Sequence, residues 1–419
     1  MNSGVRWRLS VMMFFQYVVW GMWAPVLSAY LQRSTAEGGL GFDGNQLGSI
    51  FMLLPIGCMI APLFAGQLAD RLVASEKLLA ILHLAGGVFL CILATQTSYN
   101  NFMLFMGMWS LVYGPTLALT NSLAFHHLPD AQKKFGLVRV WGTIGWIAAG
   151  ALLTLVRQLF DNKGLPGLTG DDSLWLGGFF SILLGIFCFA LPHTPPQKKG
   201  GNPLAFLAAL KMLRDPAFLI FLIIAFLVST ELQFYYMLTA PFLESIGVAK
   251  ANVSFVMTIA QMAEIGTMLA LPWMLNRWGV RKTMAVGILF WPIRYAVFAL
   301  GDPQWFVISA LTLHGICYVC FFVVAYVYVD SVAPPDIRAS AQALITFVVL
   351  GLGMALSSKF TGFIKDYFTT GTGEAMVTDW TKIFLVPCAV TVICSLVFFF
   401  GFRDRRAETA AQAIQRETA

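Results

Sequence analysis

The sequence predicts an all-α membrane protein with twelve transmembrane helices in two six-helix bundles. Three observations lead to this prediction. Of the 419 residues, 58% are hydrophobic and only 11% are charged, whereas a soluble domain carries about 25% charged residues. Twelve apolar stretches occur, most of them long enough for a bilayer crossing of about 20 residues. A hydrophilic connection separates the first six apolar stretches from the last six. This composition excludes an ordinary soluble enzyme, a disordered chain and a nucleic-acid-binding module.

The predicted spans follow one another in order along the chain. Their approximate residues are 9–31, 46–69, 77–96, 102–125, 138–158, 174–192, 217–243, 252–275, 283–300, 305–329, 339–364 and 381–402. Gly and Pro recur inside them, as membrane helices tolerate, and no sustained alternation of period two indicates a barrel. The first span follows Arg6 and Arg8 but is too long for a signal peptide and lacks a clear cleavage site. We therefore expect it to be retained as a helix.

The central connection defines the predicted domains. It contains the string HTPPQKKGGNP, typical of a linker, and then an amphipathic stretch. The predicted units are an N-terminal bundle (1–192), a cytoplasmic linker with an amphipathic helix (193–215), a C-terminal bundle (216–402) and a cytoplasmic tail (403–419). Two dipeptide signatures recur 206 residues apart: Asp70-Arg71 with Asn276-Arg277, and Pro129-Asp130 with Pro335-Asp336. A repeat of six and six spans is typical of transporters.

The basic residues predict the orientation. If both termini are cytoplasmic, 18 of the 27 Lys and Arg residues lie on the cytoplasmic side and seven on the other. This bias fits the positive-inside rule. The net charge of +6 is therefore an orientation signal and does not indicate a nucleic-acid partner.

Several chemistries are not expected from this sequence. All seven cysteines lie in apolar stretches, and Cys317 and Cys320 have CxxC spacing without a second pair, so packing is the better interpretation. There is no GxxxxGK[ST], HExxH or GxSxG motif. We predict that the protein is not an enzyme and needs no cofactor or metal. The class of protein that remains is a solute carrier driven by a gradient.

Ionisable residues within spans are costly and mark candidate sites. Arg139 begins the fifth span, and Thr143 and Trp146 follow four and seven residues later on the same helical face. A guanidinium, a hydroxyl and an indole together suit a ligand with hydroxyls and a flat ring. The alternative is an arginine that reaches to lipid phosphates at the cytoplasmic end.

Glu264 lies in the middle of the eighth span, and Gln261 precedes it by three residues on the same face. Loss of water disfavours a charged carboxylate, so reversible protonation suits this position. The two side chains also suit sugar hydroxyls. The alternative is a structural hydrogen bond or ion pair to another helix.

The seventh and tenth spans add further candidates. Gln233 and Tyr236 share one face of the seventh span, and His314 and Tyr318 lie one turn apart in the tenth. His314 is a candidate for proton transfer or ligand binding, and a packing role is equally open. Weaker candidates for lining the same site are Gln16, Trp20 and Trp23 of the first span. Glu231 and Arg294 are interpreted as a structural pair.

Six strings spread over nearly the whole chain resemble one family. They are FFQYVVWGMW, RVWGTIGW, ELQ, QMAEI, IRYAVFALGDP and IRASAQ, and they resemble the bacterial nucleoside:proton symporters of the major facilitator superfamily. The resemblance implies the major facilitator fold and a central nucleoside site between two bundles. Its site residues map to Arg139, Thr143, Trp146, Gln233, Gln261, Glu264, His314 and Tyr318.

The chain departs from this family at two positions. Some relatives have Asn where Tyr236 stands, and several have an acid immediately after the position of Tyr318, where this chain has Val319. Proton coupling would then rest on Glu264, alone or with His314.

The sequence is thus interpreted as a proton-coupled importer of nucleosides by alternating access. It would be a multi-pass protein of the bacterial inner membrane, surrounded by lipid and monomeric, with nucleosides and protons as partners. The open alternatives are a carrier for sugars or polyols, a nucleoside uniporter and a non-transporting membrane sensor.

Overall fold

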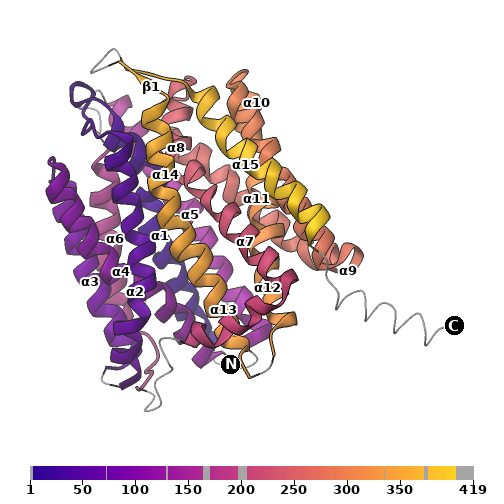
Figure 1. The fold of residues 1–419 in the computed structure, drawn as a ribbon. Helices are drawn as coiled ribbons and strands as arrows, with labels where there is room; N and C mark the ends of the chain where they lie inside the picture. Colours follow the sequence, from indigo (N-terminus) through magenta and orange to yellow (C-terminus); the bar gives the residue numbers. More distant parts are fainter. Residues whose placement is uncertain are drawn as a thin grey trace.

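In the computed structural model every long element is a helix (Figure 1). The structure describes residues 3–71, 73–128, 131–163, 170–196, 205–334, 336–371 and 376–402. The predicted tail (403–419) and part of the predicted linker (197–204) lie outside these residues.

Six helices make up the N-terminal bundle, and they pack mainly on one another. They are α1 (Ser3–Gln32), α2 (Gly44–Arg71), α3 (Ser75–Ala94), α4 (Tyr99–His127), α5 (Ala131–Asn162) and α6 (Asp172–Cys188), with the short 3₁₀ turn η1 (Thr35–Glu37) after α1. A 3₁₀ helix, η2 (Ala205–Arg214), occupies the stretch where the sequence predicts an amphipathic helix.

The C-terminal bundle contains more, shorter elements. They are α7 (Pro216–Thr230), α8 (Leu232–Ser245), α9 (Val253–Leu300), α10 (Gln304–Ala310), α11 (Leu313–Cys317), η3 (Tyr318–Val323), α12 (Val324–Val332), α13 (Arg338–Thr346), η4 (Phe347–Gly353), α14 (Met354–Tyr367) and α15 (Trp380–Gly401). An antiparallel pair, β1 (Thr369–Thr370) and β2 (Val377–Thr378), joins α14 to α15, with Thr369 opposite Thr378.

The twelve predicted spans are confirmed. Nine helical segments of the described chain are long and apolar enough to cross a membrane, and two shorter apolar segments are Gly44–Ile60 of α2 and Asp172–Cys188, which is α6. α9 has 48 residues, roughly 72 Å at 1.5 Å per residue, which suffices for two crossings. Gly279 divides it with a left-handed φ of 71°, a conformation that favours glycine. The eighth and ninth predicted spans are therefore the two halves of α9.

Two details of the tenth and eleventh spans were not predicted. Both contain a π-helical segment, η3 and η4, where the helix widens. Such segments are rare and frequent at functional sites. η3 begins at the candidate residue Tyr318.

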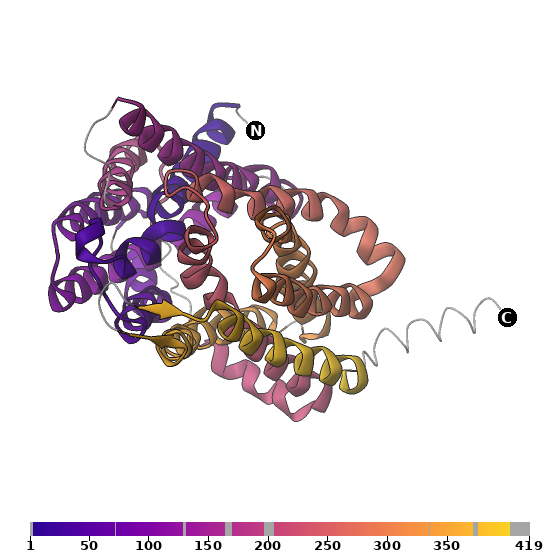
Figure 2. The same cartoon turned by 90° about the horizontal axis from the view of Figure 1, so that it is seen from above.

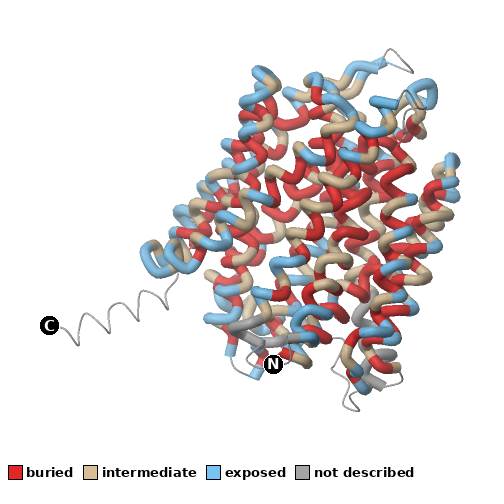
Figure 3. Tube along the Cα trace, turned by 180° about the vertical axis from the view of Figure 1, so that it is seen from behind, coloured by how far each residue is buried: buried red, intermediate tan, exposed pale blue. Residues whose placement is uncertain are grey.

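Burial follows the pattern of a membrane protein. Aromatic side chains fill the interior of each bundle, such as Trp109 and Tyr113 in the N-terminal one and Trp291 and Tyr295 in the C-terminal one. Buried and exposed positions alternate along the helices (Figure 3), and exposed positions include large apolar residues such as Leu269. Apolar surface of this kind suits lipid rather than water.

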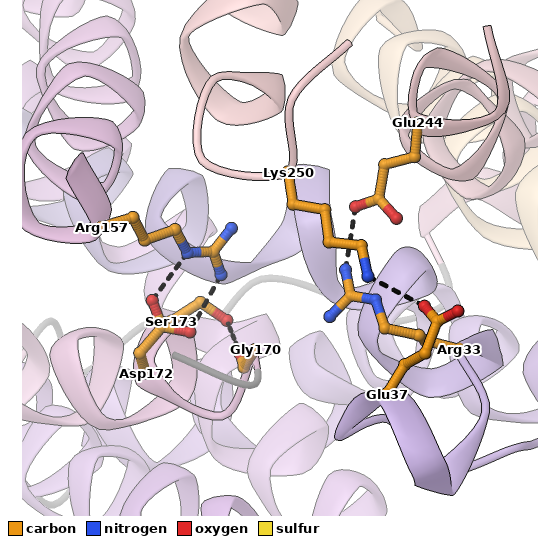
Figure 4. Close-up of polar contacts among 8 residues, drawn as sticks. All are labelled: Arg33, Glu37, Arg157, Gly170, Asp172, Ser173, Glu244 and Lys250. Carbon is orange, nitrogen blue, oxygen red and sulfur yellow. Dashed lines mark hydrogen bonds and ion pairs between the residues drawn. The ribbon is translucent and has the colours of Figure 1, made fainter. Parts of the chain in front are cut away.

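The two bundles lie side by side (Figure 2), and polar contacts join them at the end of the molecule that carries β1 and β2. We call this the hairpin end. Arg33 of α1 pairs with Glu244 of α8 at 2.9 Å, and Glu37 pairs with Lys250 at 2.8 Å (Figure 4). The Lys250 ammonium, through its hydrogen bond, holds the pKa of the Glu37 carboxyl below its usual value, so this pair is charged at neutral pH.

Further contacts reinforce the closure at the hairpin end. Gln158 bonds Asn252 at 2.8 Å, and the Asp366 carboxylate accepts from the backbone N–H of Gly44 and Asn45. The helices α2 and α14, and α5 and α9, pack across the two bundles. Figure 4 also shows Arg157 bonded to Asp172 by two nitrogens at 2.7 and 2.9 Å, which ties α5 to α6 within the N-terminal bundle.

Candidate functional site

Arg139 of α5 lies against the aromatic ring of Tyr17 on α1. Its guanidinium carbon is 4.2 Å from the ring centroid, within the range of a cation–π interaction. The sequence permits this approach because residue 142 is glycine. A Cβ there would lie 2.6 Å from the Tyr17 ring and 2.7 Å from Arg139 Nη1. Arg139 is therefore held on a neighbouring helix rather than directed only to lipid.

Trp146 continues the same face of α5 toward the hairpin end. Its ring packs edge-on against Trp20 of α1, with centroids 5.3 Å apart. Thr143, between Arg139 and Trp146, is half-buried. This face of α5 therefore carries a charge, a hydroxyl and an indole in order, and α1 adds Trp20 beside the indole.

Glu264 of α9 faces this surface from the opposite bundle. It interacts electrostatically with Arg139, and Tyr318 interacts with both residues and with Tyr17. Glu264, Arg139 and Tyr318 are each half-buried. These interactions therefore join partly accessible side chains of the two bundles.

Three rings of the C-terminal bundle form a stack beside Glu264. The His314 imidazole lies between Tyr235 and Tyr318, with centroids 4.5 and 5.7 Å away and near-parallel planes. Tyr236 meets His314 edge-on at 6.3 Å and also interacts electrostatically with Glu264 and Tyr318. The π-helical segment η3 starts at Tyr318 and therefore belongs to this stack.

Arg294 lies behind the stack and is fully buried. The sequence suggests a pair with Glu231, and the two do interact electrostatically. The hydrogen bond of the guanidinium, however, goes to His314, from Nη1 to Nδ1 at 2.8 Å. Rings of Trp291, Tyr235 and Tyr295 surround it at 4.4 to 4.9 Å. Arg294 therefore has a hydrogen-bond partner, His314, that the sequence did not predict, beside its electrostatic interaction with Glu231.

Several buried polar atoms near these residues have no hydrogen-bond partner. They include Glu231 Oε2, Gln233 Oε1 and His314 Nε2. The Tyr235 hydroxyl lies close enough to the Gln261 side chain to interact with it as a hydrogen-bond partner. Buried polar atoms are normally paired, so a group of unpaired ones favours a site for a polar ligand or water.

The three candidates from the first span lie in different surroundings. Trp20 borders Trp146, but Gln16 is completely buried and bonded to Thr116 and His83 at 2.8 Å each. Trp23 packs on Trp109 inside the N-terminal bundle, 4.9 Å between centroids. Gln16 and Trp23 therefore support the bundle interior and do not line the site.

Sequence reasoning missed Tyr17 and Tyr235. Tyr17 lies one residue after Gln16, and only the fold reveals that it meets Arg139. Within the described part of the chain, no hydrogen bond or ion pair joins Gln233 or Thr143 to the other candidates, although helical spacing puts each on the expected face. The described residues contain no group of His, Cys, Asp or Glu suited to a metal ion.

Comparison with known proteins gives the family. A model of the family described as nucleoside H+ symporter matches residues 3–407. The chain belongs to the nucleoside H+ symporter family. Among curated members it is 33% identical to the putative nucleoside transporter YegT of Escherichia coli, over 98% of this chain and 97% of that one. It is 29% identical to the xanthosine permease of the same organism, covering 95% and 96%.

A solved structure supports the same assignment. The nucleoside transporter NupG matches with a TM-score of 0.83 and 28% identity, over 96% of this chain and 100% of that one. The peptide transporter POT, at 14% identity and a TM-score of 0.72, shares the fold alone. The chain is thus a multi-pass membrane transporter with the major facilitator fold and is not an enzyme.

Proposed function

We propose that this protein imports nucleosides together with protons across the bacterial inner membrane and that the substrate binds between the bundles. The observation that carries the proposal is the electrostatic interaction between Arg139 and Glu264, two half-buried side chains that come from opposite bundles. A site built from both bundles is what alternating access requires. The family membership and the named relatives support nucleosides as the substrates.

The residues divide into contacts for the base and contacts for the ribose. The flat base would stack on Trp146 or on a ring of the tenth span, because an indole offers a large apolar face. Gln261, Glu264, Gln233 and Arg139 would bond the ribose hydroxyls, and Thr143, Tyr236, His314 and Tyr318 would complete the site. Their mixture of donors and acceptors matches hydroxyls, which are both.

Coupling follows from competition for Arg139. When Glu264 is protonated it no longer attracts the guanidinium, which is then free to bond the substrate, and the carboxyl becomes a donor. When Glu264 loses its proton, the carboxylate attracts Arg139 again and the nucleoside is released. Protonation of Glu264 thus raises the affinity for the nucleoside, and loss of the proton lowers it. Coupling requires such a difference in affinity between two states. Val319 supplies no second acid, so Glu264 is the principal coupling residue and His314 the other candidate.

The orientation is part of the proposal. With both termini in the cytoplasm, the hairpin end lies on the periplasmic side, and the structure corresponds to a state closed to the outside. A monomer suffices, since both halves of the site come from one chain.

The decisive experiment is uridine uptake by purified protein in proteoliposomes with an imposed pH gradient. We expect accumulation that follows the gradient. Glu264→Gln, which keeps the size and removes titration, should retain exchange of labelled for unlabelled uridine but lose gradient-driven accumulation. Accumulation by Glu264→Gln would remove Glu264 from coupling.

Other outcomes distinguish the alternatives. Uptake indifferent to pH in the unmodified protein would indicate a uniporter. Competition by free ribose or other sugars, but not by nucleosides, would indicate a sugar carrier. Binding of nucleosides without flux would indicate a sensor.

A further inference from the structure

The hydrogen bond between Arg294 and His314 determines the chemical form of the histidine. Arg294 Nη1 lies 2.8 Å from His314 Nδ1. A guanidinium has only donors and does not lose its proton in proteins. His314 Nδ1 must therefore accept, so it carries no proton, and the ring proton resides on Nε2. A second proton on Nδ1 would break this bond and place two positive charges in contact.

The Nε2–H of this ring has no protein partner. The atom is buried and unbonded, and His314 itself is 1% exposed. The stacking between Tyr235 and Tyr318 fixes the plane of the ring, so the direction of the N–H is fixed as well. A buried donor without a partner is costly, which makes it a place for an acceptor supplied from outside the protein.

The charged and titratable groups around the ring fit this arrangement. Arg294 approaches it from α9, Tyr235 and Tyr236 from α8, and Tyr318 from η3. Glu264 interacts with the three tyrosines, and Glu231 interacts with Arg294. No carboxylate bonds the ring, so nothing here favours an imidazolium.

We propose that Arg294 is a positioning residue that locks His314 as a neutral Nε2–H donor, and that this donor binds a hydrogen-bond acceptor of the transported nucleoside. The inference rests on the proposed function and deepens it. It assigns His314 to substrate recognition, withdraws it from proton coupling and leaves coupling to Glu264. It also gives the buried Arg294 a reason to be in the membrane.

The test compares two substitutions of His314. In His314→Gln the side-chain carbonyl can accept from Arg294 while the amide N–H replaces the Nε2 donor, without any titratable group. We expect nucleoside affinity within about threefold of the unmodified protein and intact gradient-driven accumulation. His314→Phe keeps the stacked ring but has no donor, and its affinity should fall about tenfold or more.

A second readout addresses Arg294. In Arg294→Met the histidine loses the donor that fixes its tautomer, so Nδ1 and Nε2 become alternative positions for the ring proton, and nucleoside affinity should fall several-fold. The double variant Arg294→Met with His314→Gln, whose amide keeps a donor whether or not Arg294 is present, should bind about as well as His314→Gln alone. A merely structural role of Arg294 would lower affinity or stability equally with either residue at position 314.

The acceptor is identified with uridine analogues. 2′-Deoxy- and 3′-deoxyuridine test the ribose, and an analogue without the O4 carbonyl tests the base. One of these analogues lacks the atom that accepts from His314 Nε2. This analogue and uridine should bind the His314→Phe variant with equal affinity, because neither complex contains that hydrogen bond. The matched control is His83, an equally buried histidine whose ring nitrogens face Gln16 Oε1 at 2.8 Å and Ser181 Oγ at 3.3 Å. His83→Gln should lower thermal stability and leave nucleoside affinity unchanged.

Two outcomes would overturn the inference. One is unchanged uridine affinity in His314→Phe, and the other is loss of gradient-driven accumulation in His314→Gln with exchange retained, which would make His314 the proton carrier. If the unmodified protein bound no nucleoside at all, the proposed function itself would fail, which is a separate result.

Discussion

At the scale of single residues, one glycine, Gly142, determines the part of the site that the N-terminal bundle forms. Gly142 lets the Tyr17 ring and the Arg139 guanidinium meet, since a Cβ at this position would lie within 2.7 Å of both. The same glycine therefore sets the direction of the guanidinium toward Glu264.

We predict that Gly142→Ala weakens nucleoside binding by several-fold, because either the ring or the guanidinium must move by a few tenths of an ångström or more. Gly136→Ala is the matched control on the same helix, as a Cβ there meets nothing within 4 Å. Isothermal titration with uridine gives both affinities. Equal affinity in the two variants would mean that the Tyr17 contact does not position Arg139.

The sequence predicted part of this site and missed part for a physical reason. Arg139 and Glu264 were found because a charge within an apolar span is costly wherever the helix lies. The bond between Arg294 and His314 joins two helices, and helical periodicity says nothing about contacts between them. Gln16 was misjudged for the same reason. It is polar and within a span, but its partners Thr116 and His83 come from two other helices.

At the scale of helices, α2 and α14 meet backbone to backbone across the two bundles. A Cβ on Gly48 would lie 2.5 Å from the carbonyl oxygen of Ser358, and Gly44 and Gly362 contact each other in the same way. Carbonyl groups of helices cannot rotate aside. Any side chain at these positions must therefore separate the helices.

We predict that Gly48→Ala shifts the protein toward a state open at the hairpin end. Ser254 is buried where α9 packs on Gly150 of α5, so Ser254→Cys reports on the closure. A membrane-impermeant maleimide should label Ser254→Cys several-fold faster in the presence of Gly48→Ala. Gly107→Ala, whose Cβ has its nearest neighbour at 4.0 Å, should leave the rate unchanged. Equal rates would show that the closure tolerates a methyl group.

Helix existence was easier to predict than helix detail. Apolar runs long enough for the bilayer can hardly form anything but helices there, so all twelve spans were found. The π-helical segments begin at Tyr318 and Phe347, where nothing in the local sequence signals a wider turn. They depend on packing between helices, which a pattern along one helix does not contain.

At the scale of the whole molecule, the positive-inside rule predicts that the hairpin end faces the periplasm. Lys250 lies at that end and is 54% exposed at its side chain, whereas Lys211 of η2 is 58% exposed at the opposite end. We predict that an impermeant maleimide labels Lys250→Cys in intact spheroplasts and labels Lys211→Cys only after permeabilisation. The reverse pattern would invert the proposed orientation and make the structure an outward-open one.

The pairs Glu37–Lys250 and Arg33–Glu244 hold the bundles together at the rim of the molecule, and the first is largely exposed to solvent. Dissolved ions screen such pairs over about 10 Å at 0.1 M salt, while the glycine contacts beneath them are insensitive to ions. If the hairpin end faces the periplasm, as proposed, we expect the closed state to be less stable when the ionic strength of that compartment rises. In dilute medium the protein should stay closed on that side, and in concentrated salt it should open there more often.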